Sequence, residues 1–144
     1  AGAVLAEGRA NGAAIGLERE SRGKSAGERT FALLAFAAAG FAGLGALLLG
    51  TQGTSRVIQG VATGVGFLGA GLIFQRQPSD VRGLTTAAGA WAATAIGTAV
   101  GLGMYVGATL ATVLVIAILE LDHLPFMRRI RQENEAGPPS KGPG

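Results

Sequence analysis

Long stretches of uncharged, mostly apolar residues alternate with short polar segments along this chain of 144 residues. Residues 31–49 and 57–74 carry no charge, and each stretch is close to the about 17–25 residues that a helix needs to span a bilayer. Residues 84–119 are also uncharged. As one helix they would extend about 54 Å, far beyond a hydrocarbon core of about 30 Å. We therefore expect a turn at residues 100–103, with spans over 84–100 and 104–121.

The first segment and the basic residues together predict a topology. Residues 1–17 hold Glu7, Arg9 and Asn11 among small apolar residues and are slightly short for a span. Segments 18–29 and 75–83 and the end of the chain carry ten Lys and Arg residues, whereas the opposite side carries only Arg56. Because Lys and Arg are enriched in cytoplasmic loops, we predict an all-α membrane domain over residues 1–124. It has five transmembrane helices, the N-terminus outside and the C-terminus in the cytoplasm.

The composition agrees with a membrane protein. Charged residues make up 15% of the chain, against about 25% in a typical globular domain. The absence of cysteine excludes disulfides and thiolate metal sites. A net charge of +3 could indicate nucleic-acid binding, but the basic residues lie in short blocks between apolar runs. We expect the bilayer, another membrane protein or a second copy as partners, and no nucleic acid. Residues 125–144, basic and then rich in Pro and Gly, predict a disordered cytoplasmic tail.

The stretch GVGFLGAG at residues 64–71 satisfies G-x-G-x-x-G, a pattern found in dinucleotide-binding turns. Such a turn needs a strand before it and an acid about 20 residues later, and this chain offers neither. Small residues at helical spacing instead allow membrane helices to approach closely. Two interpretations remain: packing alone, or packing together with a functional helix break. The predicted packing residues are Gly60, Gly64, Gly66, Gly69, Gly71, Gly97, Gly101, Gly103 and Gly107.

Two segments resemble each other and suggest an internal repeat, with chance similarity as the alternative. Residues 15–35 and 70–90 share Gly-Leu, a basic polar loop, and then Gly-x-x-Thr. The threonines at these helix starts, Thr30, Thr85 and Thr86, are suited to capping free backbone N–H groups.

The charged and polar residues of the first segment are the candidates for chemistry. Glu7, Asn11 and Glu18 fall on one helical face, and ionisable groups inside a membrane indicate function. Three interpretations of the inner end remain open. The first is a structural charged cluster of Glu18 and Arg19 with Arg29 or Arg82. The second is a cation site built on Glu18 and Glu20, with Mg²⁺ as the candidate ion and no other cofactor expected. The third is a surface for a protein partner.

No enzyme is indicated by the remaining motifs. His123 is the single histidine, so Glu120-x-x-His123 cannot supply the paired motifs of a di-iron site. No nucleophile motif such as G-x-S-x-G is present.

Three blocks of the chain together resemble the MgtC/SapB family of bacterial inner-membrane proteins. They are IGLERESRGKSAGERTFAL, GVGFLGAGLIF and VRGLTTAAGAWAATAIGTAVGLGMY, and the similarity covers about residues 12–121. The resemblance implies five transmembrane helices in the plasma membrane, and a link to growth at low magnesium and to virulence through survival inside macrophages. Two departures stand out. The family usually places an acid before the arginine corresponding to Arg56, and many members add a C-terminal ACT-like domain that we do not expect here.

These observations leave three classes of function. The resemblance favours a regulatory protein that acts on a membrane partner. A transporter of magnesium, another ion or a small solute is the second class, and a structural subunit of a larger membrane complex is the third.

Overall fold

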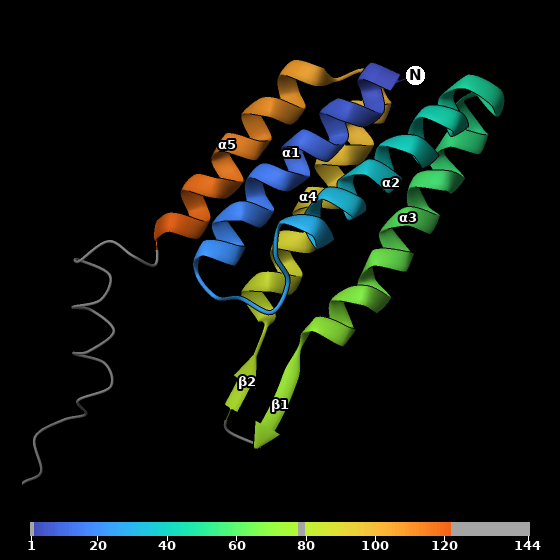
Figure 1. Ribbon diagram of the computed structural model, residues 1–144. Coiled ribbons are helices and arrows are strands. Elements are labelled where there is room, and N and C mark those ends of the chain that lie inside the picture. Colours follow the sequence, from blue (N-terminus) through green and yellow to red (C-terminus); the bar gives the residue numbers. More distant parts are fainter. Residues whose placement is uncertain (1, 78–79, 122–144) are drawn as a thin grey trace, which may run out of the picture.

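The computed structural model describes residues 2–77 and 80–121, which form an up-and-down bundle of five helices with one short β-hairpin (Figure 1). The helices are α1 (Gly2–Ser21), α2 (Glu28–Leu48), α3 (Gly50–Leu72), α4 (Leu84–Gly101) and α5 (Tyr105–Leu121). Strands β1 (Phe74–Gln77) and β2 (Asp80–Arg82) lie between α3 and α4. The prediction of five helices is confirmed. The predicted tail at 125–144 and His123 lie outside the described residues.

Two connections differ from the expected loops. Helix α3 begins at Gly50, so most of the loop expected at 50–56 forms the first turns of this helix. The chain reverses at Leu49 and Gly50. The φ of Gly50 is 63°, which lies in the left-handed region that residues with a side chain disfavour. The loop expected at 75–83 instead forms an antiparallel hairpin, with Phe74 opposite Arg82. This hairpin projects from one end of the bundle, here called the hairpin end (Figure 1).

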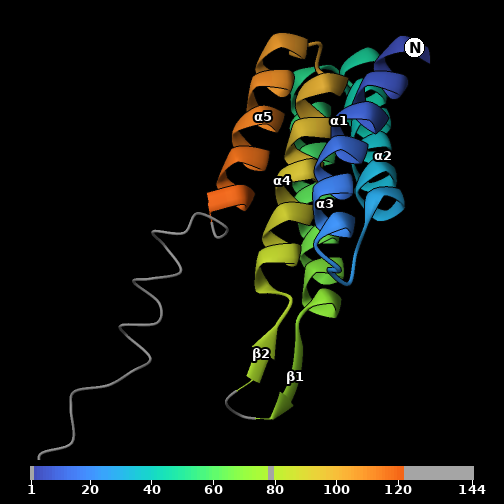
Figure 2. The same ribbon diagram turned by 60° about the vertical axis from the view of Figure 1, so that its left-hand side comes forward.

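Helix α2 lies at the centre of the bundle and packs closely against α1 and α4. A Cβ atom at Gly12 of α1 would overlap the carbonyl oxygen of Phe31, and one at Gly97 of α4 would overlap that of Ala35. The backbones therefore meet with almost no side chain between them, which is how small residues associate helices in lipid. Helix α5 packs against α4 and α1 (Figure 1 and Figure 2).

The distribution of residue size is reversed relative to a soluble protein. Alanine and glycine fill much of the centre, whereas large apolar side chains cover the outside, for example Leu47 and Val106, which are 78% and 76% exposed. Soluble monomers rarely expose contiguous apolar surface on this scale. By length and composition, α2 is the one described helix that could cross a membrane, and α5 is apolar but shorter. The glycines, threonines and charges of the other predicted spans reduce their apolar character.

Candidate functional site

The buried charges of the chain lie at the hairpin end of α1. Glu18 and Arg19 pair through Oε2 and Nε at 3.1 Å, and their side chains are only 5% and 3% exposed. Their burial follows from Gly16, where a Cβ atom would lie 2.5 Å from the Cα atom of Glu28. The end of α1 is thereby held directly against the start of α2. A buried ion pair requires good geometry and further hydrogen bonds to offset its desolvation, and the Glu18 oxygens and Arg19 Nε and Nη1 make no such bond.

Arg22 extends this pair to another helix. Its Nε lies 3.8 Å from Oε1 of Glu18, and its Nη2 donates a hydrogen bond to Oε2 of Glu120 near the end of α5. The hydrogen bond to Glu120 is the main cause that raises the pKa of Arg22 above its ordinary value. The resulting charge network of Glu18, Arg19, Arg22 and Glu120 connects α1 and its following loop to α5.

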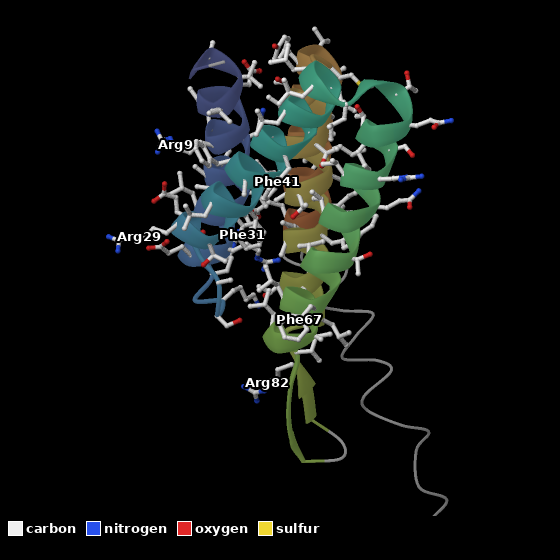
Figure 3. The ribbon with its side chains drawn as sticks, turned by 90° about the vertical axis from the view of Figure 1, so that its right-hand side faces the viewer. Arg9, Arg29, Phe31, Phe41, Phe67 and Arg82 are labelled. Atoms are coloured by element: carbon white, nitrogen blue, oxygen red, sulfur yellow. The ribbon has the colours of Figure 1, made fainter. Side chains whose placement is uncertain are left out.

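The expected pairing of Glu18 with Arg29 or Arg82 is therefore corrected. Both ion pairs described for Glu18 are made with arginines at the end of its own segment. Arg29 is exposed and points away from the bundle (Figure 3), and Arg82 is the last residue of strand β2 in the hairpin. Sequence reasoning missed Arg22 and Glu120 as members of the network. The i, i+4 spacing of Glu18 and Arg22 was an available signal for one of them.

Glu20 has a structural role at the start of α2. Its Oε2 accepts a hydrogen bond of 3.0 Å from the backbone N–H of Glu28, and a Cβ atom at Gly27 would lie 2.5 Å from that same oxygen. A carboxylate at this position satisfies a free N–H group and interacts favourably with the helix dipole. Glu18 and Glu20 thus serve different neighbours. Within residues 2–77 and 80–121, no three acidic, histidine or cysteine side chains gather where they could hold a metal ion.

The threonines expected to cap α2 and α4 do not do so. The N-cap residues are Gly27 and Gly83, which have no side chain to cap with, and at the start of α2 the carboxylate of Glu20 accepts the N–H of Glu28 instead. Thr30 and Thr85 are exposed, whereas Thr86 is buried. At Gly83, a φ of 91° and the nearby carbonyl of Leu72 leave room for glycine alone.

A polar pair connects α1 and α5 inside the bundle. Thr112 Oγ1 lies 3.1 Å from Oδ1 of Asn11 and 2.9 Å from the carbonyl oxygen of Ala108. One hydroxyl proton can serve only one of these acceptors, and Asn11 Nδ2 is buried without a partner. Turning the Asn11 amide by 180° places Nδ2 opposite the threonine oxygen. Nδ2 then donates to Thr112 Oγ1, and the hydroxyl of Thr112 donates to Ala108 O. Glu7, one turn nearer the N-terminus, is partly buried.

The predicted packing glycines divide into two groups. Gly97 and Gly101 make backbone contact with α2, and Gly69 approaches Ala87 with a virtual Cβ distance of 3.9 Å. The others have open space where a Cβ would lie, which corrects their assignment as packing residues within this bundle; they are Gly60, Gly64, Gly66, Gly71, Gly103 and Gly107. Sequence reasoning missed Gly8, Gly12 and Gly16, although their spacing of four was a direct signal.

The course of α3 answers the question raised by GVGFLGAG. The helix runs without interruption from Gly50 to Leu72, so residues 64–71 form neither a dinucleotide-binding turn nor a helix break. Helix α3 contacts α2 and α4, and a cavity lies beside it on each of these two sides. One, of about 430 Å³, lies between α2 and α3, and the other, of about 160 Å³, lies between α3 and α4. Both are lined mainly by apolar residues, which do not suit a hydrated cation.

Comparison with known proteins identifies relatives of this chain. MgtC of Brucella abortus (strain 2308) is 43% identical over 107 residues, which are 74% of this chain and 44% of that protein. SrpB of Synechococcus elongatus is 44% identical over 114 residues, covering 65% and 59% of the two chains. The Escherichia coli K12 protein named "Putative magnesium transporter YhiD" is 42% identical over 118 residues, covering 76% and 54%. No solved structure matches significantly.

The chain spans about half the length of the relatives that it matches. The sequence profile of the MgtC family matches residues 5–124, which include α2 to α5 and all but the first three residues of α1. The resemblance found in the three sequence blocks is thereby confirmed, and the chain belongs to the MgtC family.

Proposed function

We propose that this chain is a multi-pass protein of the bacterial inner membrane with a regulatory, non-enzymatic role exerted by binding another membrane protein. The apolar outer surface supports insertion into a bilayer, because large side chains such as Leu47 and Val106 would otherwise face water. The excess of Lys and Arg in the segments at the hairpin end supports a cytoplasmic position for that end. The family resemblance links this role to growth at low magnesium and to intracellular survival.

The observation that carries the regulatory proposal is the closed centre of the bundle. Helices α1, α2 and α4 meet at backbone contact around Gly12 and Gly97, where even a methyl group would overlap a carbonyl oxygen. A solute path along this centre would need polar groups facing a water-filled space. Two of the buried threonines of α4 instead use their hydroxyls within the helix, since Thr94 donates to Ala90 O and Thr98 donates to Thr94 O.

Magnesium transport is the second candidate, and the name of the relative YhiD favours it. Helix α3 would then have to move, because the cavities beside it are apolar and Mg²⁺ prefers oxygen ligands. A structural subunit of a larger complex is the third candidate, and the open glycine positions of α3 favour it.

Reconstitution and complementation together test the proposal. Proteoliposomes loaded with a magnesium-sensitive dye should show no influx above protein-free liposomes. The same protein should restore low-magnesium growth to a bacterium that lacks its own MgtC-family protein, without raising magnesium uptake. Influx above the control would establish transport and overturn the proposal. Restored growth that requires a fixed-ratio complex, with no free pool of the protein, would favour the structural role.

A further inference from the structure

Helix α3 presents a polar face to the outside of the bundle. Only Thr54 and Val65 of its 23 residues are buried. The exposed residues Gln52, Arg56, Gln59 and Thr63 follow one another at spacings of four, three and four, which places them on one side of the helix. Uncompensated polar groups are costly against lipid tails, and intramembrane charges generally have a partner. Thr63 donates its hydroxyl to Gln59 O. The side chains of Gln52, Arg56 and Gln59 make no hydrogen bond within the described residues. This face therefore suits a polar partner within the membrane.

Small residues accompany the polar face. Gly60 lies one turn from Arg56, and Gly60 and Gly64 border the cavity between α2 and α3. No heavy atom lies within 4 Å of where their Cβ atoms would be. The glycines thus have no packing role in a single chain, although they permit another helix to approach at backbone distance. The polar stripe and the open glycines together define a docking surface on α3.

A complementary charge lies on the far side of the same chain. Glu7 precedes Gly8, which packs against Ala39 of α2. Arg56 precedes Val57, which packs against Gly45 of α2. Both charges therefore lie in the half of the bundle opposite the hairpin end. Both helices start at the same end of the bundle (Figure 1). Helix α3 packs against α2 and α4, whereas α1 packs against α2, α4 and α5. Neither charge has an ion pair with another described residue.

The surface next to Glu7 also suits close approach. Ala3, Ala6 and Ala10 are exposed and follow at spacings of three and four beside Glu7. Arg9 is two residues from Glu7 and therefore points to another side of α1, where it projects away from the bundle (Figure 3). An incoming helix that presents Arg56 can thus reach Glu7 over a face of small side chains.

We propose that the α3 docking surface binds α1 of a second copy in the same membrane orientation, with Arg56 paired to Glu7 of that copy. Both charges lie in the half of the bundle opposite the hairpin end, so this pairing is possible only between copies that point the same way. A symmetric contact of α3 with α3 would bring Arg56 against Arg56, and like charges in an apolar medium repel strongly. In a head-to-tail pair, the α3 docking surface of one copy and the α1 face of the other remain unoccupied. Further copies can bind there, so the assembly either closes into a ring or grows as an open chain.

The absence of cysteine from the chain allows a direct test by disulfide cross-linking in membranes. Gln59 and Ala10 each lie three residues after a member of the proposed pair, so Gln59→Cys and Ala10→Cys should approach each other when Arg56 meets Glu7 between parallel helices. Two differently tagged single variants, co-expressed and oxidised, should give a dimer that contains both tags. Each variant expressed alone should stay monomeric. As the matched control, Gln59→Cys with Arg9→Cys should not cross-link, because Arg9 points to another side at the same depth.

Charge reversal tests the ion pair in the same assay. Arg56→Glu or Glu7→Arg alone should abolish the mixed dimer, and the two reversals combined should restore it. Cross-linking of Gln59→Cys with itself would overturn the proposal in favour of a symmetric contact. Absence of any cross-link, in variants that melt like the parent in detergent, would overturn it in favour of another occupant of α3. These residues are exposed or only partly buried, so the variants should fold.

Discussion

Arg22, in the loop that follows α1, donates a hydrogen bond from Nη2 to Oε2 of Glu120, 98 positions later in the chain. This contact ties the hairpin end of α1 to the last turn of α5. Both side chains are partly exposed, at 32% and 45%. Their connection to the buried pair of Glu18 and Arg19 places one exposed and one buried interaction in the same network, so the two can be compared directly.

The exposed part of the network should contribute little to stability. Arg22→Gln and Glu120→Gln should each lower the melting temperature slightly at low salt, and the difference should vanish at high salt, because exposed ion pairs are screened. Arg29→Gln, which removes an exposed arginine outside the network, serves as the control and should match the parent. A large loss that persists at high salt would show that Arg22 is needed for folding of the loop.

The buried part should contribute much more. Glu18→Gln leaves Arg19 buried without its charge partner, and breaking one side of a buried pair costs about 3–5 kcal/mol. The double variant Glu18→Gln/Arg19→Gln should recover part of this loss, whereas Glu18→Gln/Arg29→Gln should recover none. Unfolding free energies in mixed detergent measure the difference. Recovery with Arg29 rather than Arg19 would contradict the pairing in the structure.

Two glycines test the packing of the bundle. Gly97→Ala should destabilise the fold by about 1–3 kcal/mol, because the new methyl group would be forced against the backbone of α2. Gly107→Ala has open space and should stabilise α5 by up to about 1 kcal/mol through helix propensity. Thermal melts of the two variants in one detergent should therefore shift in opposite directions. Shifts in the same direction would mean that these helices are arranged differently.

The polar pair of Asn11 and Thr112 should show a small positive coupling. A double-mutant cycle with Asn11→Ala and Thr112→Ala should give about 0.6 kcal/mol, and at most about 1.7, as for other hydrogen bonds within membrane bundles. The exposed Thr109, which donates only to Tyr105 O, provides the control cycle and should give zero. Equal values in the two cycles would show that α1 and α5 do not meet at Asn11.

Reporter fusions test the proposed topology. Reporters after Lys24 and Gly137 should score as cytoplasmic, and reporters at Gly50 and Gly103 should score as external. The reason is that most Lys and Arg residues lie in the segments on the same side as Lys24 and Gly137. An external signal after Lys24 would reverse the orientation. Mixed signals at Gly50 and Gly103 would contradict a bundle whose helices all cross the bilayer.

Much of the fold could be predicted because helix length and apolar runs are local properties. Uncharged stretches located the helices, and the glycines at 101 and 103 located the reversal between α4 and α5. The polar segment before α4 contains no local pattern that predicts its β-hairpin. Its strands pair with each other beyond the end of the bundle, and strand pairing depends on register between two segments rather than on composition.

The sequence alone determined that five helices form, that these helices consist mainly of small and apolar residues, and that many charged residues lie at one end of the bundle. The tertiary structure decided which glycines meet a backbone and which arginine meets Glu18. Gly12 and Gly97 each belong to glycines spaced by four residues, and both lie at helix contacts. Gly60 and Gly64 are also four residues apart, but they face open space. Arg22 reaches Glu18, whereas Arg29 points away from the bundle. Spacing fixes the side of a helix that a residue occupies, but only the arrangement of neighbouring helices determines what that side contacts.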